Sequence, residues 1–295
     1  MNNYAIITDS TSDLSLELRQ KYDIDYVMMN YVIDDIEYPA SLDWESHSVK
    51  EFYDTMRGGT RVFTTQVPRN IYEEKFSSYV EQGKDLIYIA CSSALSGSVN
   101  IARIVANELM EKYPERKIYC VDSLISSLGQ AYLALTASTM RTNGKSVDEV
   151  AAFIEANKLK VNQCGTVESL EYLKRAGRVK ASSAFFGNIF GVKPIIISDR
   201  LGQNFAIKKV KGTMNALQAI AQEICDAANG DYDTLYISHA DNEMLAEKLR
   251  EAILSIAPFT NVVTGIIGPI VGASVGPGTI IAFCYGKEVM IEGNV

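Results

Sequence analysis

Residues 85–98 read DLIYIACSSALSGS, a short β-rich run that leads into a loop of four serines and one glycine. The run from Asp85 to Ala90 predicts a strand, and the residues after the loop, Val99 to Tyr113, predict a helix. The same order of strand, polar loop and helix is predicted at Tyr4 to Thr8 followed by DSTSD, and at Lys117 to Val121 followed by Asp122-Ser123 and a helix from Ser127 to about Asn143. This alternation is typical of βαβ units around a mainly parallel sheet, which makes the fold class α/β.

The serine loop itself predicts an anion site. Loops at the carboxyl edge of an open α/β sheet bring hydroxyls and helix N-termini together, and both bind the oxygens of an anion. Two other interpretations stay open. The serines could simply cap the following helix, or Ser96 could be a nucleophile, which would need a base such as histidine. His47 and His239 are the only histidines, and neither lies in a segment that obviously supplies that base.

A second domain is predicted after Lys160, where the sequence changes to shorter extended pieces separated by charged turns. We expect an N-terminal α/β domain over residues 1–160 and a C-terminal α+β domain over residues 161–295. We also expect strands at Asp25 to Val32, Thr234 to Ser238 and Thr279 to Cys284; extended pieces at Leu173 to Arg178, Phe205 to Val210 and Val289 to Glu292; and helices at Ser48 to Arg57, Ala181 to Phe190, Gly212 to Ala228 and Asn242 to Ile256.

Composition excludes several classes of partner. The net charge is −8 and no basic run occurs, which argues against nucleic acid. No apolar stretch is long enough to span a bilayer, and the first residues lack the pattern of a signal peptide, so we expect a cytoplasmic protein with no stable membrane insertion. The five cysteines are scattered and form no CxxC pair, so we expect them to be reduced, and with two histidines we expect no metal.

Three further segments carry candidate ligand groups. Thr64-Thr65-Gln66-Val67-Pro68 offers two hydroxyls and an amide before a helix, although a simple helix start would look similar. Leu173 to Arg178 places two arginines beside a glycine, where a guanidinium could hold a carboxylate, although a solvated turn is commoner. Gly268 to Gly278 alternates glycine and proline with apolar residues around Ser274, which suits either close approach to a ligand or tight domain packing.

Taken together and in this order, these segments resemble the DegV family. That family carries a TSQ triplet, an SSxLSGT loop, a VDS strand end, an LxRGGR turn, a KP-apolar strand and a GPxxGxHxGPG segment. The matching stretches here are Thr64-Thr65-Gln66, Ser92 to Ser98, Val121-Asp122-Ser123, Leu173 to Arg178, Lys193-Pro194-Ile195 and Gly268 to Gly278, with Ile7 to Asp13 also similar. The resemblance runs the length of the chain.

The resemblance implies a two-domain DegV-like (EDD) fold that binds a long-chain fatty acid between its domains, with no other cofactor. It further implies a protein without turnover of its own that presents the bound carboxylate to a bacterial fatty acid kinase, which forms an acyl phosphate. The implied roles are carboxylate binding for Thr64 and Ser96, assistance from Thr65, and a head-group contact for Arg175. Ser274 stands where the family has histidine; a hydroxyl can donate a hydrogen bond but carries no charge.

Phe185-Phe186 and Ile189-Phe190 are candidates to line the tunnel for the acyl chain. Two other functions are alternatives to fatty acid binding and presentation. One is a serine-dependent or phosphate-handling enzyme that uses the same cleft, and the other is a lipid-responsive interaction protein whose partner is not a kinase.

Overall fold

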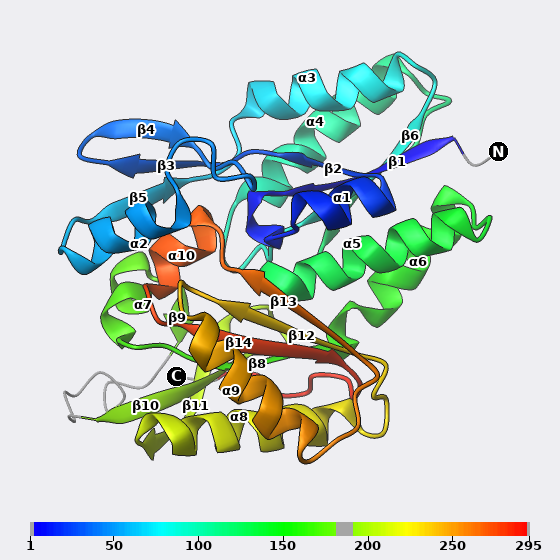
Figure 1. Ribbon diagram of the computed structural model, residues 1–295. Coiled ribbons are helices and arrows are strands. Elements are labelled where there is room, and N and C mark those ends of the chain that lie inside the picture. Colours follow the sequence, from blue (N-terminus) through cyan, green and yellow to red (C-terminus); the bar gives the residue numbers. More distant parts are fainter. Residues whose placement is uncertain (1–2, 181–190, 294–295) are drawn as a thin grey trace.

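A computed structural model of the protein describes residues 3–180 and 191–293. Its two main sheets lie one above the other and share a layer of helices (Figure 1). Within the described part of the chain, none of the helices combines the length and the apolarity that crossing a membrane requires.

The first sheet has the order β2-β1-β6-β7, and all its neighbouring strands run parallel. This confirms the parallel α/β sheet that the repeated strand–loop–helix pattern predicts. The elements up to residue 160 are β1 (Tyr4–Asp9), η1 (Ser10–Ser12), α1 (Leu16–Tyr22), β2 (Ile24–Val27), β3 (Asn30–Ile33), β4 (Ile36–Pro39), α2 (Val49–Arg57), β5 (Val62–Thr65), α3 (Arg69–Val80), β6 (Asp85–Ala90), α4 (Ser98–Lys112), β7 (Ile118–Asp122), α5 (Ser127–Thr142), α6 (Val147–Asn157) and η2 (Lys158–Lys160).

The predicted strand from Asp25 to Val32 was wrong as a single element. The chain leaves the first sheet after Val27 and enters a separate antiparallel sheet of order β4-β3-β5. Strand propensity along a run of residues does not determine how many strands the run forms, because the point where one strand ends and the next begins depends on the strands with which each half pairs. The small sheet brings Thr64, at the end of β5, opposite Tyr31 of β3.

The second sheet has the order β13-β12-β14-β8-β10-β11-β9 and mixes parallel with antiparallel pairs. Its elements are β8 (Val161–Thr166), α7 (Leu170–Ala176), β9 (Val179–Lys180), β10 (Val192–Ser198), β11 (Asn204–Lys211), α8 (Thr213–Ala228), β12 (Thr234–His239), α9 (Glu243–Leu254), β13 (Asn261–Ile266), α10 (Pro269–Val275) and β14 (Ile280–Tyr285). The chain thus changes sheets at residue 161, and we propose residues 1–160 and 161–295 as its two domains.

Three predictions for this half need correction or fall outside the structure. Leu173 to Arg178 is not extended, since α7 covers Leu170–Ala176 after the Ser169 side chain accepts the N–H of Glu171 at its start. Val289 to Glu292 forms no strand. The predicted helix from Ala181 to Phe190, with its candidate tunnel residues, lies outside the described residues.

Helix α5 is the layer that joins the two sheets. It packs against β1 and β6 of the first sheet and against β12, β14 and β8 of the second (Figure 1). Helices α3 and α4 cover the outer face of the first sheet, and α8 and α9 cover the outer face of the second. Ten residues of α5 are buried, several of them small, as a helix enclosed on two sides requires.

Hydrogen bonds between side chains and backbone tie the two halves together. Ser92 of the serine loop donates to the carbonyl of Gly202 at 2.8 Å, and Ser198 donates to the carbonyl of Leu124 at 3.0 Å. Tyr53 of α2 donates to the carbonyl of Ile267 at 2.6 Å. Because these groups are buried, each bond also satisfies an atom that would otherwise lose its contact with water.

The contact between the serine loop and the turn at Gly202 predicts an effect of Gly202→Ala on stability. Gly202 has φ +77°, and a Cβ there would lie 2.2 Å from Ser92 Oγ and 2.8 Å from Leu124 Cα. The matched control is Gly144→Ala, since Gly144 has φ +83° but no atom within 4 Å of the added Cβ.

We expect Gly144→Ala to lower the free energy of unfolding by about 1 kcal/mol through backbone strain, and Gly202→Ala to cost about 1–3 kcal/mol more through overpacking. Denaturant unfolding of both variants measures the difference. Equal losses would contradict the close approach of the two segments.

Candidate functional site

The candidate site is a cavity of about 250 Å³ between the two sheets, at the carboxyl edge of the first. Its walls come from four places. The residues are Thr11, Cys91, Leu95, Ser96, Gly97 and Ser126 from the loops after β1, β6 and β7; Met29, Thr64, Thr65 and Gln66 from the region of the small sheet; Gln163, Arg178, Asn204 and Ile281 from the second sheet and the turn before β9; and Ile270, Val271, Ser274 and Val275 from α10.

The four serines of the serine loop, Ser92, Ser93, Ser96 and Ser98, make different contacts. Ser92 ties the loop to Gly202, and Ser93 is exposed and does not line the cavity. Ser96 lines the cavity, with its hydroxyl 2.9 Å from that of Ser98. The N-cap of α4 is Gly97, which has no side chain, and the Ser96 hydroxyl accepts the N–H of Ser98, the first residue of the helix, at 3.3 Å.

Ser98 joins the serine loop to the threonine loop. Its hydroxyl is fully buried and accepts the backbone N–H of Val67 at 3.2 Å while it pairs with Ser96. Gly97 also lies close to Gln66, because a Cβ at Gly97 would sit 2.8 Å from the Gln66 side-chain oxygen. The two loops, about thirty positions apart in sequence, are therefore held side by side at the cavity.

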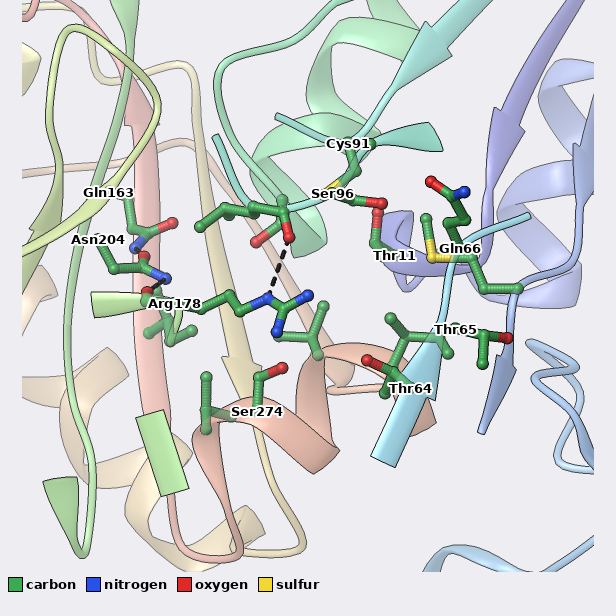
Figure 2. Close-up of a pocket in the computed structure, with 18 residues that line it drawn as sticks. Thr11, Thr64, Thr65, Gln66, Cys91, Ser96, Gln163, Arg178, Asn204 and Ser274 are labelled. Atoms are coloured by element: carbon green, nitrogen blue, oxygen red, sulfur yellow. Dashed lines mark hydrogen bonds between the residues drawn. The ribbon is translucent and has the colours of Figure 1, made fainter. Parts of the chain in front are cut away.

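Thr64 and Ser274 face each other across the cavity, with the guanidinium of Arg178 beside them (Figure 2). Ser274 is carried by α10, which packs on β3, β5 and η1 of the other half. Thr65 lies at the rim and is exposed, and its hydroxyl donates to Glu37 at 3.2 Å. Of the predicted residues, the structure thus brings Thr64, Thr65, Ser96 and Ser274 into one cavity.

Arg175, the fifth predicted residue, does not line this cavity. Its guanidinium lies over the ring of Tyr172, 4.8 Å from the centroid, and borders an adjoining cavity of about 100 Å³. The adjoining cavity shares Thr64, Arg178 and Ser274 with the larger one, so Arg175 is a neighbour of the same hydroxyl groups.

Of the two arginines in the candidate segment Leu173 to Arg178, Arg178 is the one that lines the main cavity, whereas the resemblance implied a role for Arg175. Helix α7 ends at Ala176, and Gly177 takes the left-handed conformation with φ +68°, which turns the chain before Arg178. Arg178 Nε donates to the carbonyl of Leu95 at 3.2 Å, which places the guanidinium against the serine loop (Figure 2). Gly177 was the signal in the sequence that could have distinguished the two arginines. A helix that ends before this glycine leaves Arg175 on the helix and Arg178 on the chain beyond it, so the two side chains point in different directions.

Neither histidine supplies a base to Ser96. The ring of His47 pairs with the Tyr31 hydroxyl at 2.7 Å, and Nδ1 of His239 accepts the N–H of Asn242 at 3.2 Å. Among the residues that line the main cavity, Cys91 is the nearest to a nucleophile in type, but burial raises the pKa of its thiol well above the usual value. A neutral thiol is a poor nucleophile, so the cavity offers binding groups rather than an activated attacking group.

Two buried aspartates hold the loops beneath the cavity. Asp9 accepts the N–H of Thr11 at 2.9 Å, the N–H of Cys91 at 3.0 Å and the hydroxyl of Tyr88 at 2.8 Å. Asp13 reaches the other half of the molecule, where it accepts the N–H of Gly268 at 2.9 Å. Thr11 and Cys91 both line the cavity, so Asp9 sets the position of two of its walls.

No group of three or more His, Cys, Asp or Glu side chains among residues 3–180 and 191–293 is placed to hold a metal ion. The cysteines in these ranges are free, and all except Cys120 are buried.

The fold and the site define an α/β protein with a cavity of polar and aliphatic residues between two stacked sheets. The chain matches the family described as "Uncharacterised protein, DegV family" over residues 3–287. It is 36% identical to a DegV domain-containing protein of Clostridium perfringens, with 97% of this chain and 98% of that one covered. The chain belongs to the DegV family.

Two solved structures have the same fold. A DegV family protein from Thermus thermophilus, described as binding fatty acid, is 26% identical with a TM-score of 0.87, over 97% of this chain and 100% of that one. DegV from Bacillus subtilis, described as a fatty acid binding protein, is 25% identical with a TM-score of 0.83 over the same shares. The DegV-like fold expected from the sequence is thereby confirmed.

Asp13 predicts a dependence of stability on pH. Burial raises the pKa of this carboxyl to about 7, although the bonds from Ser127 and Gly268 oppose the rise. An aspartate in the unfolded chain ionises near pH 4, so between about pH 4 and 7 the folded state keeps a proton that the unfolded state has lost. The free energy of unfolding therefore falls as the pH rises through this window, by at most about 1.4 kcal/mol per pH unit.

We expect Asp13→Asn to remove most of this slope, because an amide oxygen can still accept from Gly268 and Asn tolerates the left-handed backbone with φ 54°. Denaturant unfolding at several pH values measures the slope. Asp35→Asn is the control, since Asp35 is exposed and also left-handed with φ 63°. A wild-type slope equal to that of Asp13→Asn would contradict the assignment.

Proposed function

We propose that this protein binds a long-chain fatty acid in the main cavity, with the carboxylate among Thr64, Ser96, Ser274 and Arg178. The observation that carries the proposal is that hydroxyls and a guanidinium share one cavity with an aliphatic wall. That wall consists of Met29, Leu95, Ile270, Val271, Val275 and Ile281. The fatty acid binding described for the Thermus and Bacillus relatives supports the same choice of ligand.

The proposed groups match the chemistry of a carboxylate. An ionised carboxylate only accepts hydrogen bonds, and threonine, serine and arginine can all donate. Within the described residues, the Nη2 end of Arg178 donates to no protein atom, so it remains free for an anion. We assign Thr65 and Arg175 secondary roles at the rim, where both are exposed.

The acyl chain supplies most of the affinity in this proposal. Each buried methylene contributes about 0.8 kcal/mol, while the polar groups fix the position of the head. Ser96 acts as a hydrogen-bond donor and not as a nucleophile, because its hydroxyl pairs with that of Ser98 and no histidine borders the cavity. A serine-dependent enzyme in the same cleft is therefore disfavoured by the geometry of its serine.

The test is native mass spectrometry of the purified protein, followed by titration of delipidated protein with palmitate and oleate. We expect a co-purified fatty acid and saturable binding of at least one of the two acids. Absence of both would contradict the proposed function.

The same titration, repeated with Ser96→Ala, tests whether the carboxylate of the fatty acid contacts Ser96. We expect a loss of about 1–3 kcal/mol in binding free energy, since one carboxylate oxygen would lose its donor. Ser93→Ala is the matched control, because Ser93 belongs to the same loop but is exposed and outside the cavity. Equal affinities for the two variants would mean that Ser96 does not contact the carboxylate.

We also propose that the bound carboxylate is presented to a fatty acid kinase. The adjoining cavity beside Thr64 and Ser274 is bordered by Arg61, Arg175 and Arg178, and all three arginines are exposed. Cations at this position favour the approach of an anionic phosphoryl donor. In the transfer, a carboxylate oxygen forms a bond to the γ-phosphorus of ATP and the bond to ADP breaks.

The kinase proposal is tested with the oleate-loaded protein, a bacterial fatty acid kinase and ATP, with acyl phosphate trapped by hydroxylamine. We expect product only when this protein is present, and a several-fold slower rate with Arg175→Gln when both proteins are saturated with oleate. Arg250→Gln serves as the control, because Arg250 is a partly exposed arginine on α9 that pairs with Glu247, away from the cavity. Tight oleate binding without any acyl phosphate would reject the kinase role and leave the binding role intact.

A further inference from the structure

One polar side chain in the main cavity has no evident use for an unsubstituted acyl chain. Gln163 lies on β8, is only 7% exposed, and lines the cavity beside the aliphatic residues Val275 and Ile281. Figure 2 places Gln163 and its neighbour Asn204 on the far side of Arg178 from Thr64. This amide pair therefore belongs to the part of the cavity beyond the proposed head group.

The orientation of the Gln163 amide is fixed by a chain of two hydrogen bonds. Gln163 Nε2 donates to Asn204 Oδ1 at 3.1 Å, and Asn204 Nδ2 donates to the backbone carbonyl of Arg178 at 3.0 Å. The carbonyl of Arg178 can only accept, so Asn204 must direct its NH₂ group there and its oxygen toward Gln163. The oxygen of Gln163 is consequently left facing the cavity (Figure 2).

This amide oxygen receives no hydrogen bond from any described residue. A plain alkyl chain cannot donate one, and a buried acceptor that loses water without a replacement is unfavourable. The ligand group that fits must therefore be a donor. A second carboxylate is excluded because it only accepts, whereas a neutral hydroxyl can donate and adds little volume to the chain.

We propose that the cavity selects a hydroxylated acyl chain, with the ligand hydroxyl donating to Gln163 Oε1. This inference rests on the proposed fatty acid binding and specifies its substrate class. The hydroxyl is carried by the chain and not by the head, because Arg178 separates the amide pair from Thr64 (Figure 2).

The experiment measures the Kd of delipidated full-length protein for stearate and for 3-, 10- and 12-hydroxystearate. We expect at least one hydroxystearate to bind ten or more times tighter than stearate. Gln163→Leu should reduce that ratio to about one, mainly by weakening the hydroxystearate, because leucine cannot accept a hydrogen bond.

Gln66→Leu is the matched control. Gln66 lines the same cavity at the threonine loop, so its loss should change the affinities for stearate and hydroxystearate by the same factor and keep their ratio. If the wild-type protein prefers a hydroxystearate and Gln163→Leu keeps the same ratio of hydroxystearate to stearate affinity, the assignment of the hydroxyl to Gln163 is overturned.

The wild-type measurements decide the inference even if Gln163→Leu fails to fold. Equal affinity for stearate and all three hydroxystearates overturns the hydroxyl preference alone, and the fatty acid proposal stands. Failure to bind any of the four acids overturns both proposals.

Discussion

The site depends on the hydrogen bonds that the side chain of Asp9 accepts. This side chain is fully buried at the end of β1, and no cation pairs with it among the described residues. Buried carboxyl oxygens that have lost water need hydrogen bonds in its place, and the N–H groups of Thr11 and Cys91 supply them. That requirement holds the loops after β1 and β6 together and forms one wall of the cavity.

The opposite wall is held by bonds between the two halves of the chain. Asp13 binds Gly268 at the start of α10, which sets where Ser274 lies, and Ser92 binds Gly202 near β11, the strand that begins with Asn204. The polar groups of the ligand site and the polar groups that join the halves are neighbours on the same loops. A change in the packing of the halves would therefore also move the proposed head-group site.

The cavity combines a polar end with an aliphatic wall, and the polar end is built from weak, neutral donors around a single guanidinium. Such a site suits the proposed carboxylate and offers no activated nucleophile, since the Ser96 hydroxyl bonds only to Ser98 among the described residues. The amide of Gln163 adds a second polar point further along the cavity. Two separated polar points can select a chain by its substituents, which a uniform apolar tunnel cannot do.

The order of strands, loops and helices in the sequence predicted the parallel first sheet and the serine loop at its carboxyl edge, because that order fixes which loops share a sheet edge. The family motifs added Thr64, Thr65 and Ser274, which the structure brings to the same cavity as Ser96. The sequence by itself also determined the family through motifs spread along the chain. Three features became visible only in the folded chain: Arg178 rather than Arg175 enters the main cavity, residues 25–32 divide between two sheets, and the side-chain oxygen of Gln163 faces the cavity (Figure 2). These features depend on the end of a helix, on the partner of each strand and on hydrogen bonds between distant residues, and none of those is a local property of the sequence.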